Sequence, residues 1–181
     1  MGKLIVSTYA TLDGRADDLQ EWTIPYNSDA AAAYHGDLLE QCDGLLLGRR
    51  TYEVFAALWP ARAGELPYID AINRMPKYVA STTLQDLRWA NSHVIGGDVA
   101  QGVAELKRRA GRDLVVYGGH SLIGALREHD LVDEYRILVH PVLLGKGRAL
   151  AEDGAPRVDL TLVDTTVLTG GVAVLTYRPA R

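Results

Sequence analysis

Cysteine is almost absent from this chain, since Cys42 is the one cysteine among 181 residues. A single thiol excludes an internal disulfide framework and every cysteine-rich zinc site. Cys42 lies in an apolar, helix-like pattern, so we expect a buried and unreactive thiol rather than a nucleophile. The five histidines show no metal-ligand spacing. We therefore predict no metal site.

Long hydrophobic runs and an excess of basic charge are also missing. No apolar run approaches the length that spans a bilayer, and the first one is too short for a signal peptide. We therefore expect a cytoplasmic protein without a membrane partner. The net charge of −4 argues against a nucleic-acid partner bound through bulk charge. Hydrophobic residues make up 48% and charged residues 23%. This composition is ordinary for a globular protein, and the length predicts one domain over residues 1–181.

Strand-like and helix-like segments alternate along the first two thirds of the chain. Strands are expected in residues 3–14, 44–48, 76–82, 92–97 and 113–119, and helices in 27–44, 51–58, 68–75, 98–111 and 120–130. The first long helix has Asn27 or Ser28 as a candidate N-cap and Gly44 as its expected end. The last third contains three strand-like runs, 131–145, 157–170 and 171–179. The pattern predicts an α/β fold with a mixed, mostly parallel sheet between helices and antiparallel C-terminal strands.

Two expected strand-to-helix junctions are unusual. Gly48 is followed by Arg49 and Arg50 at the start of a helix, where the helix dipole disfavours cations. Gly118 and Gly119 end a buried strand just before another helix. In open α/β sheets ligands bind beyond the carboxyl ends of the strands, where helix N-termini offer free N–H groups to anions. The two junctions are therefore candidates for a diphosphate site.

A further phosphate is suggested by the side chains at the same edge. An arginine guanidinium can bind phosphate through two hydrogen bonds, and Ser81, Thr82 and Thr83 add hydroxyls after another strand. Together these features indicate NADP rather than NAD. Each feature also has a structural interpretation: the glycine pair as a turn, the arginines as solvated surface, and the hydroxyls as caps.

Several segments in this order resemble a known family. "LLLGRRTYE", "YVAST" and "VVYGGHSL" resemble the dihydrofolate reductase superfold. With "VSTYATLDG", "EWTIPYNSDA" and "LVDEYRILVHPVLLGKGRAL", they are more similar to the reductase half of the riboflavin-biosynthesis deaminase–reductase and its stand-alone relatives. The resemblance spans nearly the whole chain. The deaminase half needs a His/Cys/Cys zinc site, which one cysteine cannot supply, so only the reductase half is matched.

The resemblance implies NADPH as cofactor, a homodimer, and hydride transfer to a small heterocyclic or carbonyl substrate. The activity would be like that of the pyrimidine reductase or of dihydrofolate reductase. It places the cofactor on Gly48, Arg49, Arg50, Thr51, Ser81, Thr82, Gly118, Gly119, Ser121 and Leu122. The apolar face of the strand in residues 131–145 is the expected dimer surface, with core packing as its alternative.

Candidates for the substrate side are fewer. Asp13 in "TLDG" matches the family motif beside the implied nicotinamide site, and is our candidate catalytic residue; its alternative is an Asp-Gly turn. Trp22 would either stack on a flat substrate or hold its loop in place. Tyr9 and Tyr52 are further aromatic candidates, and Glu53 is the nearest acid after the first junction.

Two other functions fit the same residues. A non-catalytic nucleotide-binding or sensor protein would bind the cofactor without turnover, and the lack of a clear catalytic acid favours it. A protein that serves assembly alone would have no nucleotide site. We rank the reductase first because the three junctions follow successive strands.

Overall fold

The computed structural model describes residues 2–151 and 153–180 and contains one eight-stranded sheet of order β4-β3-β2-β5-β1-β6-β8-β7. The first six strands of this order are parallel, whereas β8 and β7 run antiparallel to their neighbours. The strands are β1 (Leu4–Thr11), β2 (Cys42–Gly48), β3 (Lys77–Ala80), β4 (Ser92–Ile95), β5 (Asp113–Tyr117), β6 (Glu134–His140), β7 (Leu160–Val167) and β8 (Ala173–Pro179). The predicted mixed sheet with antiparallel C-terminal strands is confirmed.

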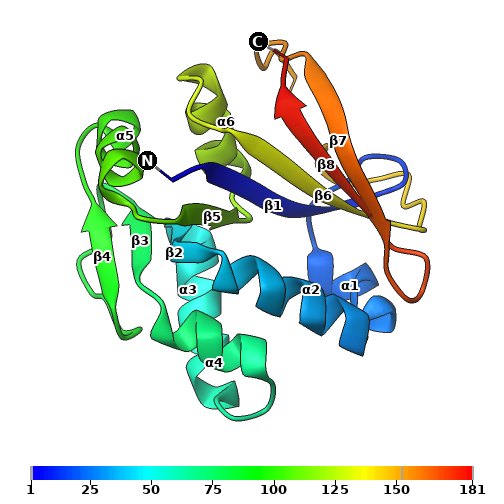
Figure 1. Cartoon of the computed structure of the whole chain (residues 1–181), viewed down its shortest axis with the longest axis horizontal. Helices are drawn as coiled ribbons and strands as arrows, with labels where there is room; N and C mark the ends of the chain where they lie inside the picture. The colour runs from blue at the N-terminus through cyan, green and yellow to red at the C-terminus, as the bar shows by residue number, and fades with distance from the viewer. Residues whose placement is uncertain (1, 152, 181) are drawn as a thin grey trace.

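Helices cover both faces of the parallel part of the sheet (Figure 1). They are α1 (Leu19–Trp22), α2 (Asp29–Glu40), α3 (Arg49–Leu58), α4 (Pro67–Arg74), α5 (Val99–Arg109) and α6 (His120–Glu128), with short 3-10 turns at Ile24–Tyr26 and Pro60–Arg62. α2, α3 and α4 lie on one face, and α5 and α6 lie on the other. Each face has its own hydrophobic core, because alternate residues of the buried strands point to opposite sides.

The first long helix begins as predicted but ends earlier than we expected. The Ser28 hydroxyl accepts a hydrogen bond from the Ala31 N–H at 3.2 Å and caps α2. The helix ends at Glu40, and Gly44 lies inside β2 instead of terminating the helix. Gly44 is required by the packing of the sheet and not by the end of a helix, because a Cβ at this position would lie 2.7 Å from the Tyr78 ring of the neighbouring strand β3. Cys42 is likewise in β2, where it is buried, and burial raises the pKa of its thiol to about 12.

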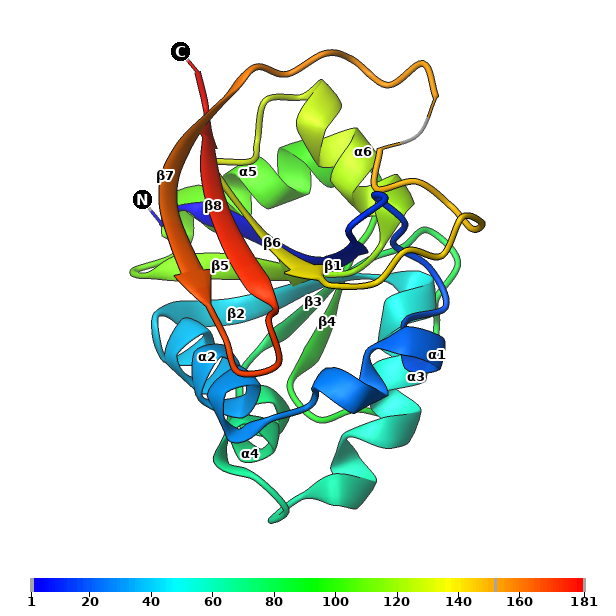
Figure 2. The ribbon, with the colours of Figure 1, turned by 90° about the vertical axis from the view of Figure 1, so that its right-hand side faces the viewer.

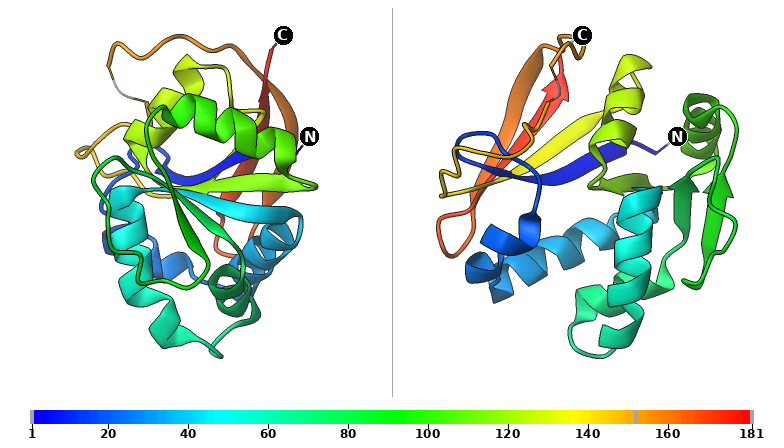
Figure 3. Two further views of the ribbon diagram at one scale, coloured as in Figure 1. Left: turned by 90° about the vertical axis from the view of Figure 1, so that its left-hand side faces the viewer. Right: turned by 180° about the vertical axis from the view of Figure 1, so that it is seen from behind.

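β5 lies between β1 and β2 in the sheet, although it follows both by many residues. As a result α3, which follows β2, and α6, which follows β5, leave neighbouring strands toward opposite faces. The two views of Figure 3 show α3 (cyan) and α6 (yellow-green) on opposite sides of the sheet. Such a reversal of strand order opens a crevice at the carboxyl ends of the strands, and ligands bind there in open α/β folds.

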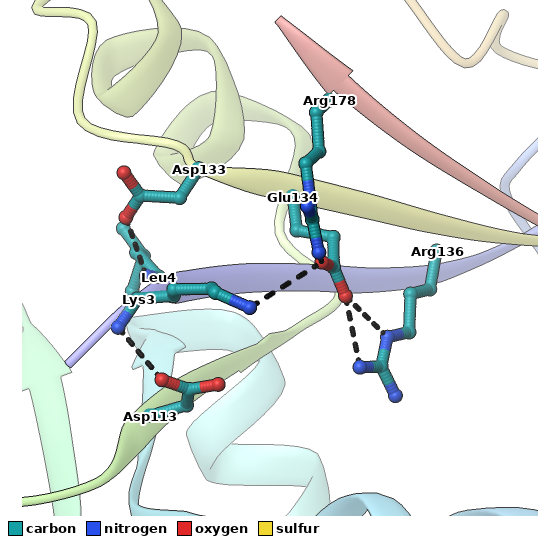
Figure 4. A network of polar contacts seen from close by, with 7 residues as sticks. All are labelled: Lys3, Leu4, Asp113, Asp133, Glu134, Arg136 and Arg178. Atoms are coloured by element: carbon teal, nitrogen blue, oxygen red, sulfur yellow. Dashed lines mark hydrogen bonds and ion pairs between the residues drawn. The ribbon is translucent and has the colours of Figure 1, made fainter. Parts of the chain in front are cut away.

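A buried carboxylate forms ion pairs at the amino ends of the parallel strands, opposite their carboxyl ends. Glu134, at the start of β6, has a side chain only 3% exposed. Its Oε1 accepts a hydrogen bond from Arg136 Nε at 2.8 Å, its Oε2 accepts one from Arg178 Nη2 at 3.1 Å, and Lys3 Nζ lies 3.9 Å away (Figure 4). The cations keep the pKa of this carboxyl below its usual value although burial opposes them. This cluster joins Lys3, just before β1, to β6 and β8 at the amino ends of the parallel strands.

β7 forms one edge of the sheet, and all eight of its residues are exposed. Figure 2 shows β7 and β8 at the front, with no helix between them and the viewer. β6, whose apolar face we expected to form a dimer surface, lies between β1 and β8 in the sheet, and that surface stays a prediction. Within residues 2–151 and 153–180, no helix has the length and apolar character needed to cross a membrane.

Candidate functional site

The two glycine junctions predicted from the sequence meet in the structure. Gly48 is the N-cap of α3 and Gly119 is the N-cap of α6. A Cβ on Gly119 would lie 3.8 Å from the Gly48 nitrogen, and one on Gly118 would lie 3.3 Å from the Thr51 hydroxyl. Gly118 and Gly119 both have positive φ, of 63° and 81°, a conformation that favours glycine. Two helix N-termini therefore lie beside one small region of partly exposed backbone, which suits a diphosphate.

Arg49 and Arg50 are exposed at the first turn of α3, beside this region. Arg49 Nη1 lies 3.6 Å from Glu53 Oε1, and both side chains are about half exposed. Such a pair contributes only a few tenths of a kcal/mol. Glu53, a predicted substrate contact, therefore lies on the outer surface of α3 as the partner of Arg49. A phosphate can displace this pairing at little cost, so both arginines remain available to an anion.

The other predicted cofactor residues lie along the same edge, but two of them have structural roles. The Ser81 hydroxyl accepts hydrogen bonds from the N–H groups of Thr83 and Leu84 at 3.2 and 3.0 Å, so it caps the turn after β3. Thr82 and Ser121 are exposed. Leu122 is only 6% exposed and packs in the core beneath α6. Its side chain therefore shapes the junction from below and is not presented to a ligand.

Tyr52 is not a substrate contact, contrary to our expectation. It is 2% exposed, packs in the core between α3 and the sheet, and accepts a hydrogen bond from the Trp89 N–H at 3.0 Å. The reason is helix periodicity, because Tyr52 is on the inner face of α3 whereas Arg49 and Glu53 are on its outer face.

Trp22 is also buried, at 4% exposure, and its indole N–H donates to the Asp17 carbonyl at 2.9 Å. Its ring packs edge-on against His140, with 5.0 Å between centroids. The alternative interpretation of Trp22, in which it holds its loop in place, therefore describes it, and stacking on a substrate does not.

The Asp13 carboxylate is held by hydrogen bonds within its own turn and to the segment after β6. Its two carboxylate oxygens accept hydrogen bonds from Thr11 Oγ1 at 2.6 Å, from the Gly145 N–H at 2.7 Å and from the Leu144 N–H at 3.1 Å. These bonds, led by the one from Thr11, lower the pKa of Asp13 to about 2. The carboxylate is thus ionised at neutral pH and joins the turn after β1 to the segment after β6. These contacts fit the alternative interpretation of Asp13 as a turn residue, and its catalytic role stays a prediction.

A chain of three polar side chains that we did not single out as a unit lies at the same edge. Tyr9 Oη is 2.6 Å from His35 Nε2, and His35 Nδ1 is 3.0 Å from Tyr117 Oη. We call these three residues the Tyr–His–Tyr chain. Tyr117 directly precedes Gly118. In the sheet Tyr117 pairs with Ser7 of β1, and Tyr9 follows Ser7 by two residues on the same strand. Tyr9 was one aromatic candidate in the sequence, but no sequence pattern linked it to a histidine on α2.

The Tyr–His–Tyr chain is uncharged at neutral pH. Burial lowers the pKa of His35 to about 4 and raises the pKa of Tyr9 and of Tyr117 above the usual range. The ionisable groups with the largest further influence on the two tyrosines are other tyrosines and the Cys42 thiol. Across the described ranges 2–151 and 153–180, no group of His, Cys, Asp and Glu side chains is arranged to hold a metal ion.

A family model described as the RibD C-terminal domain matches residues 2–174. The chain belongs to the RibD C-terminal domain family. Among curated proteins of similar sequence, the uncharacterized protein YyaP of Bacillus subtilis (strain 168) is 32% identical over 145 residues, which are 78% of this chain and 77% of YyaP. The resemblance to the riboflavin-biosynthesis reductase that the sequence motifs indicated is thereby confirmed.

Solved structures place this RibD C-terminal domain protein in the dihydrofolate reductase-like fold. A putative riboflavin biosynthesis protein from Shewanella sp. PV-4 superposes with a TM-score of 0.76 at 23% identity, covering 99% of each chain. Dihydrofolate reductase from Enterococcus faecalis, in complex with NADP(H) and RAB-propyl, superposes with a TM-score of 0.66 at 16% identity, covering 99% of this chain and 98% of that one. The family and the fold are those of reductases.

Proposed function

We propose that this chain is an NADPH-dependent reductase that transfers hydride to a small heterocyclic or carbonyl substrate. The observation that supports it most is the close approach of the α3 and α6 N-termini at Gly48 and Gly119, which follow neighbouring strands where the strand order reverses. This region would hold the diphosphate through backbone N–H groups. The nicotinamide would supply the hydride, and the protein would position the two reactants.

Arg49 and Arg50 would select NADPH over NADH. The two cofactors differ by one phosphate on the adenosine ribose, and a guanidinium binds a phosphate through two charge-assisted hydrogen bonds. A bound phosphate would also offset the repulsion between these two arginines and the positive end of the α3 dipole. This would account for two cations at the start of a helix.

Cofactor titration tests the proposal. The purified protein is titrated with NADPH and with NADH, following quenching of its three tryptophans, alongside Arg49→Ala and Arg50→Ala. We expect NADPH to bind at least about tenfold more tightly than NADH, and at least one variant to lose most of this preference. Arg62→Ala is the matched control, since Arg62 is a part-exposed arginine paired with Glu65 beyond the end of α3. Equal binding of the two cofactors, or none, would overturn the proposal.

Turnover separates a reductase from the second candidate, a nucleotide-binding protein without catalysis. The lack of a clear catalytic acid favours that candidate, and the hydrogen bonds of Asp13 fit its structural interpretation as a turn residue. NADPH binding with no NADPH oxidation by pterin, pyrimidine or carbonyl compounds would support the second candidate.

We further propose that the protein is a homodimer formed through the exposed face of β7. Leu162 is 50% exposed and Val167 is 69% exposed on this edge strand. They point to the same side of the sheet, opposite Tyr177 and Ala173 of β8. A second copy of the chain would remove this apolar strip from water, and self-association by two-fold symmetry is the commonest way to do so.

A further inference from the structure

A small cavity of about 140 Å³ lies between α6 and the segment that joins β6 to β7. Figure 2 shows this segment passing beside α6. One face of α6 lines the cavity through His120, Ile123, Gly124 and Arg127. The facing wall includes Leu150, Ala151 and Ala155. None of the residues proposed to hold the cofactor lines this cavity, so it is separate from the cofactor site.

The guanidinium of Arg127 has no partner among the described residues. Its Nε is buried, and within residues 2–151 and 153–180 it has no hydrogen-bond acceptor. No carboxylate of these residues forms an ion pair with Arg127 either. A buried donor without an acceptor is destabilising, and a charged one more so. An anion in the cavity would remove this cost by accepting the hydrogen bonds of the guanidinium.

Gly124 keeps the cavity open. It lies inside α6, where glycine is less stable than alanine. Its φ is not positive, and no atom lies within 4 Å of a Cβ added to it. Neither backbone conformation nor close packing therefore requires a glycine at this position. Because Gly124 lines the cavity, a side chain here would occupy the space that a ligand would need.

The rest of the lining limits the kind of anion that fits. Ile123, Leu150, Ala151 and Ala155 provide apolar surface, whereas the exposed Asp153 adds one negative charge. That charge disfavours a dianion such as phosphate more than it disfavours a monoanion. A guanidinium binds a carboxylate through two parallel hydrogen bonds, and apolar surface suits a hydrocarbon chain. The cavity has room for roughly five water-sized groups of about 30 Å³ each.

We propose that this cavity binds a small aliphatic monocarboxylate. The carboxylate pairs with Arg127, and the short hydrocarbon chain lies against Ile123 and Leu150 beside the open space at Gly124. The proposal does not depend on the reductase function, because the cavity shares no residue with the proposed cofactor site.

Three small probes test this site in the whole chain at constant ionic strength. Propionate has the proposed chemistry, phosphate has a higher charge without an apolar part, and propylammonium has the opposite charge. Each is titrated into the ¹⁵N-labelled protein, following the Arg127 Nε–Hε resonance by NMR. We expect propionate to shift this resonance saturably and to bind at least about tenfold more tightly than the other two. The absence of a saturable shift, or equal binding of phosphate or propylammonium, would overturn the proposal.

Matched variants assign the binding to the cavity. Arg127→Gln should weaken propionate binding at least about tenfold, measured at the Gly124 amide resonance. Arg109→Gln is the control, because Arg109 lies in the last turn of α5 as Arg127 does in α6, but is exposed and does not line the cavity. Equal affinities in these two variants would contradict the role of Arg127.

Gly124→Leu tests the cavity without removing its charge. Leucine is a good helix former, so α6 should remain folded, and its side chain should fill the space beside Arg127 and abolish propionate binding. The Arg127 Nε–Hε resonance again reports the binding. Unchanged affinity in Gly124→Leu would show that propionate binds outside the cavity and would refute the site.

Discussion

Lys77, at the start of β3, is a fully buried lysine. Its ammonium donates hydrogen bonds to the carbonyls of Asn73 at 2.6 Å and Ala90 at 2.8 Å, and lies 4.4 Å from the centre of the Trp89 ring. Among the described residues no carboxylate forms an ion pair with it. Burial therefore lowers the pKa of Lys77 from 10.5 to about 8. The sequence signalled none of this, because "PKYVAST" is an ordinary strand pattern and the burial comes from α4 and the chain after β3.

Lys77→Met should change how stability depends on pH. Between pH 8 and 10.5 the folded protein releases the Lys77 proton while the unfolded chain keeps it, so the unfolded state binds more protons and stability rises with pH. The free energy of unfolding of the natural protein, minus that of Lys77→Met, should therefore rise by up to about 3 kcal/mol across this window. Urea unfolding at a series of pH values measures this difference, in which the titration of other groups cancels. A flat difference would show that Lys77 titrates normally.

At the scale of the element, the β5–α6 junction depends on glycine for its backbone conformation. Gly119 has a φ of 81° and caps α6, and its missing Cβ leaves the Gly48 nitrogen accessible. The sequence predicted this junction well, since a glycine pair between an apolar strand and an amphipathic helix is a local signal. The inward position of Tyr52 also follows from helix periodicity, since it lies on the face of α3 opposite Arg49 and Glu53.

Gly119→Ala should weaken both folding and cofactor binding. A left-handed alanine costs about 1–2 kcal/mol, and its methyl group would occupy the region proposed for the diphosphate. We expect at least about tenfold weaker NADPH binding. Gly124→Ala in the same helix is the control, because no atom lies within 4 Å of its added Cβ. That change should raise stability by about 0.5–1 kcal/mol and leave NADPH affinity unchanged. Unfolding and cofactor titrations measure both; unaltered affinity in Gly119→Ala would argue against the proposed diphosphate position.

At the scale of the whole molecule, the two halves of the sheet are covered differently. Helices pack on both faces of the parallel strands, whereas β7 is an exposed edge strand with leucine and valine on its surface. Exposed edge strands pair readily with other chains. The sequence predicted an apolar dimer surface on the face of the strand that became β6, and the exposed apolar residues of β7 add a second candidate surface.

Leu162→Glu should dissociate the proposed dimer. Glutamate would place a charge in the buried centre of the interface, where it would lose its hydration without a partner. Thr161→Glu is the control, since Thr161 is exposed on the same strand and points to the other face, opposite Arg178. Light scattering after size-exclusion chromatography should give a dimer for the natural protein and for Thr161→Glu, and a monomer for Leu162→Glu. A monomeric natural protein would refute the dimer, and a dimeric Leu162→Glu would place its interface elsewhere.

The sequence by itself determined the local elements of this protein: the buried strands, the Ser28 cap and the glycine junctions. These follow from periodicity, capping and backbone sterics, which act within a few residues. Tertiary structure alone decided where those elements meet. Inserting β5 between β1 and β2 brought Gly119 to Gly48, and it joined His35 to Tyr9 and Tyr117 across 26 and 82 residues. Such contacts depend on strand order, which is set by packing of the whole sheet and which no short stretch of residues encodes.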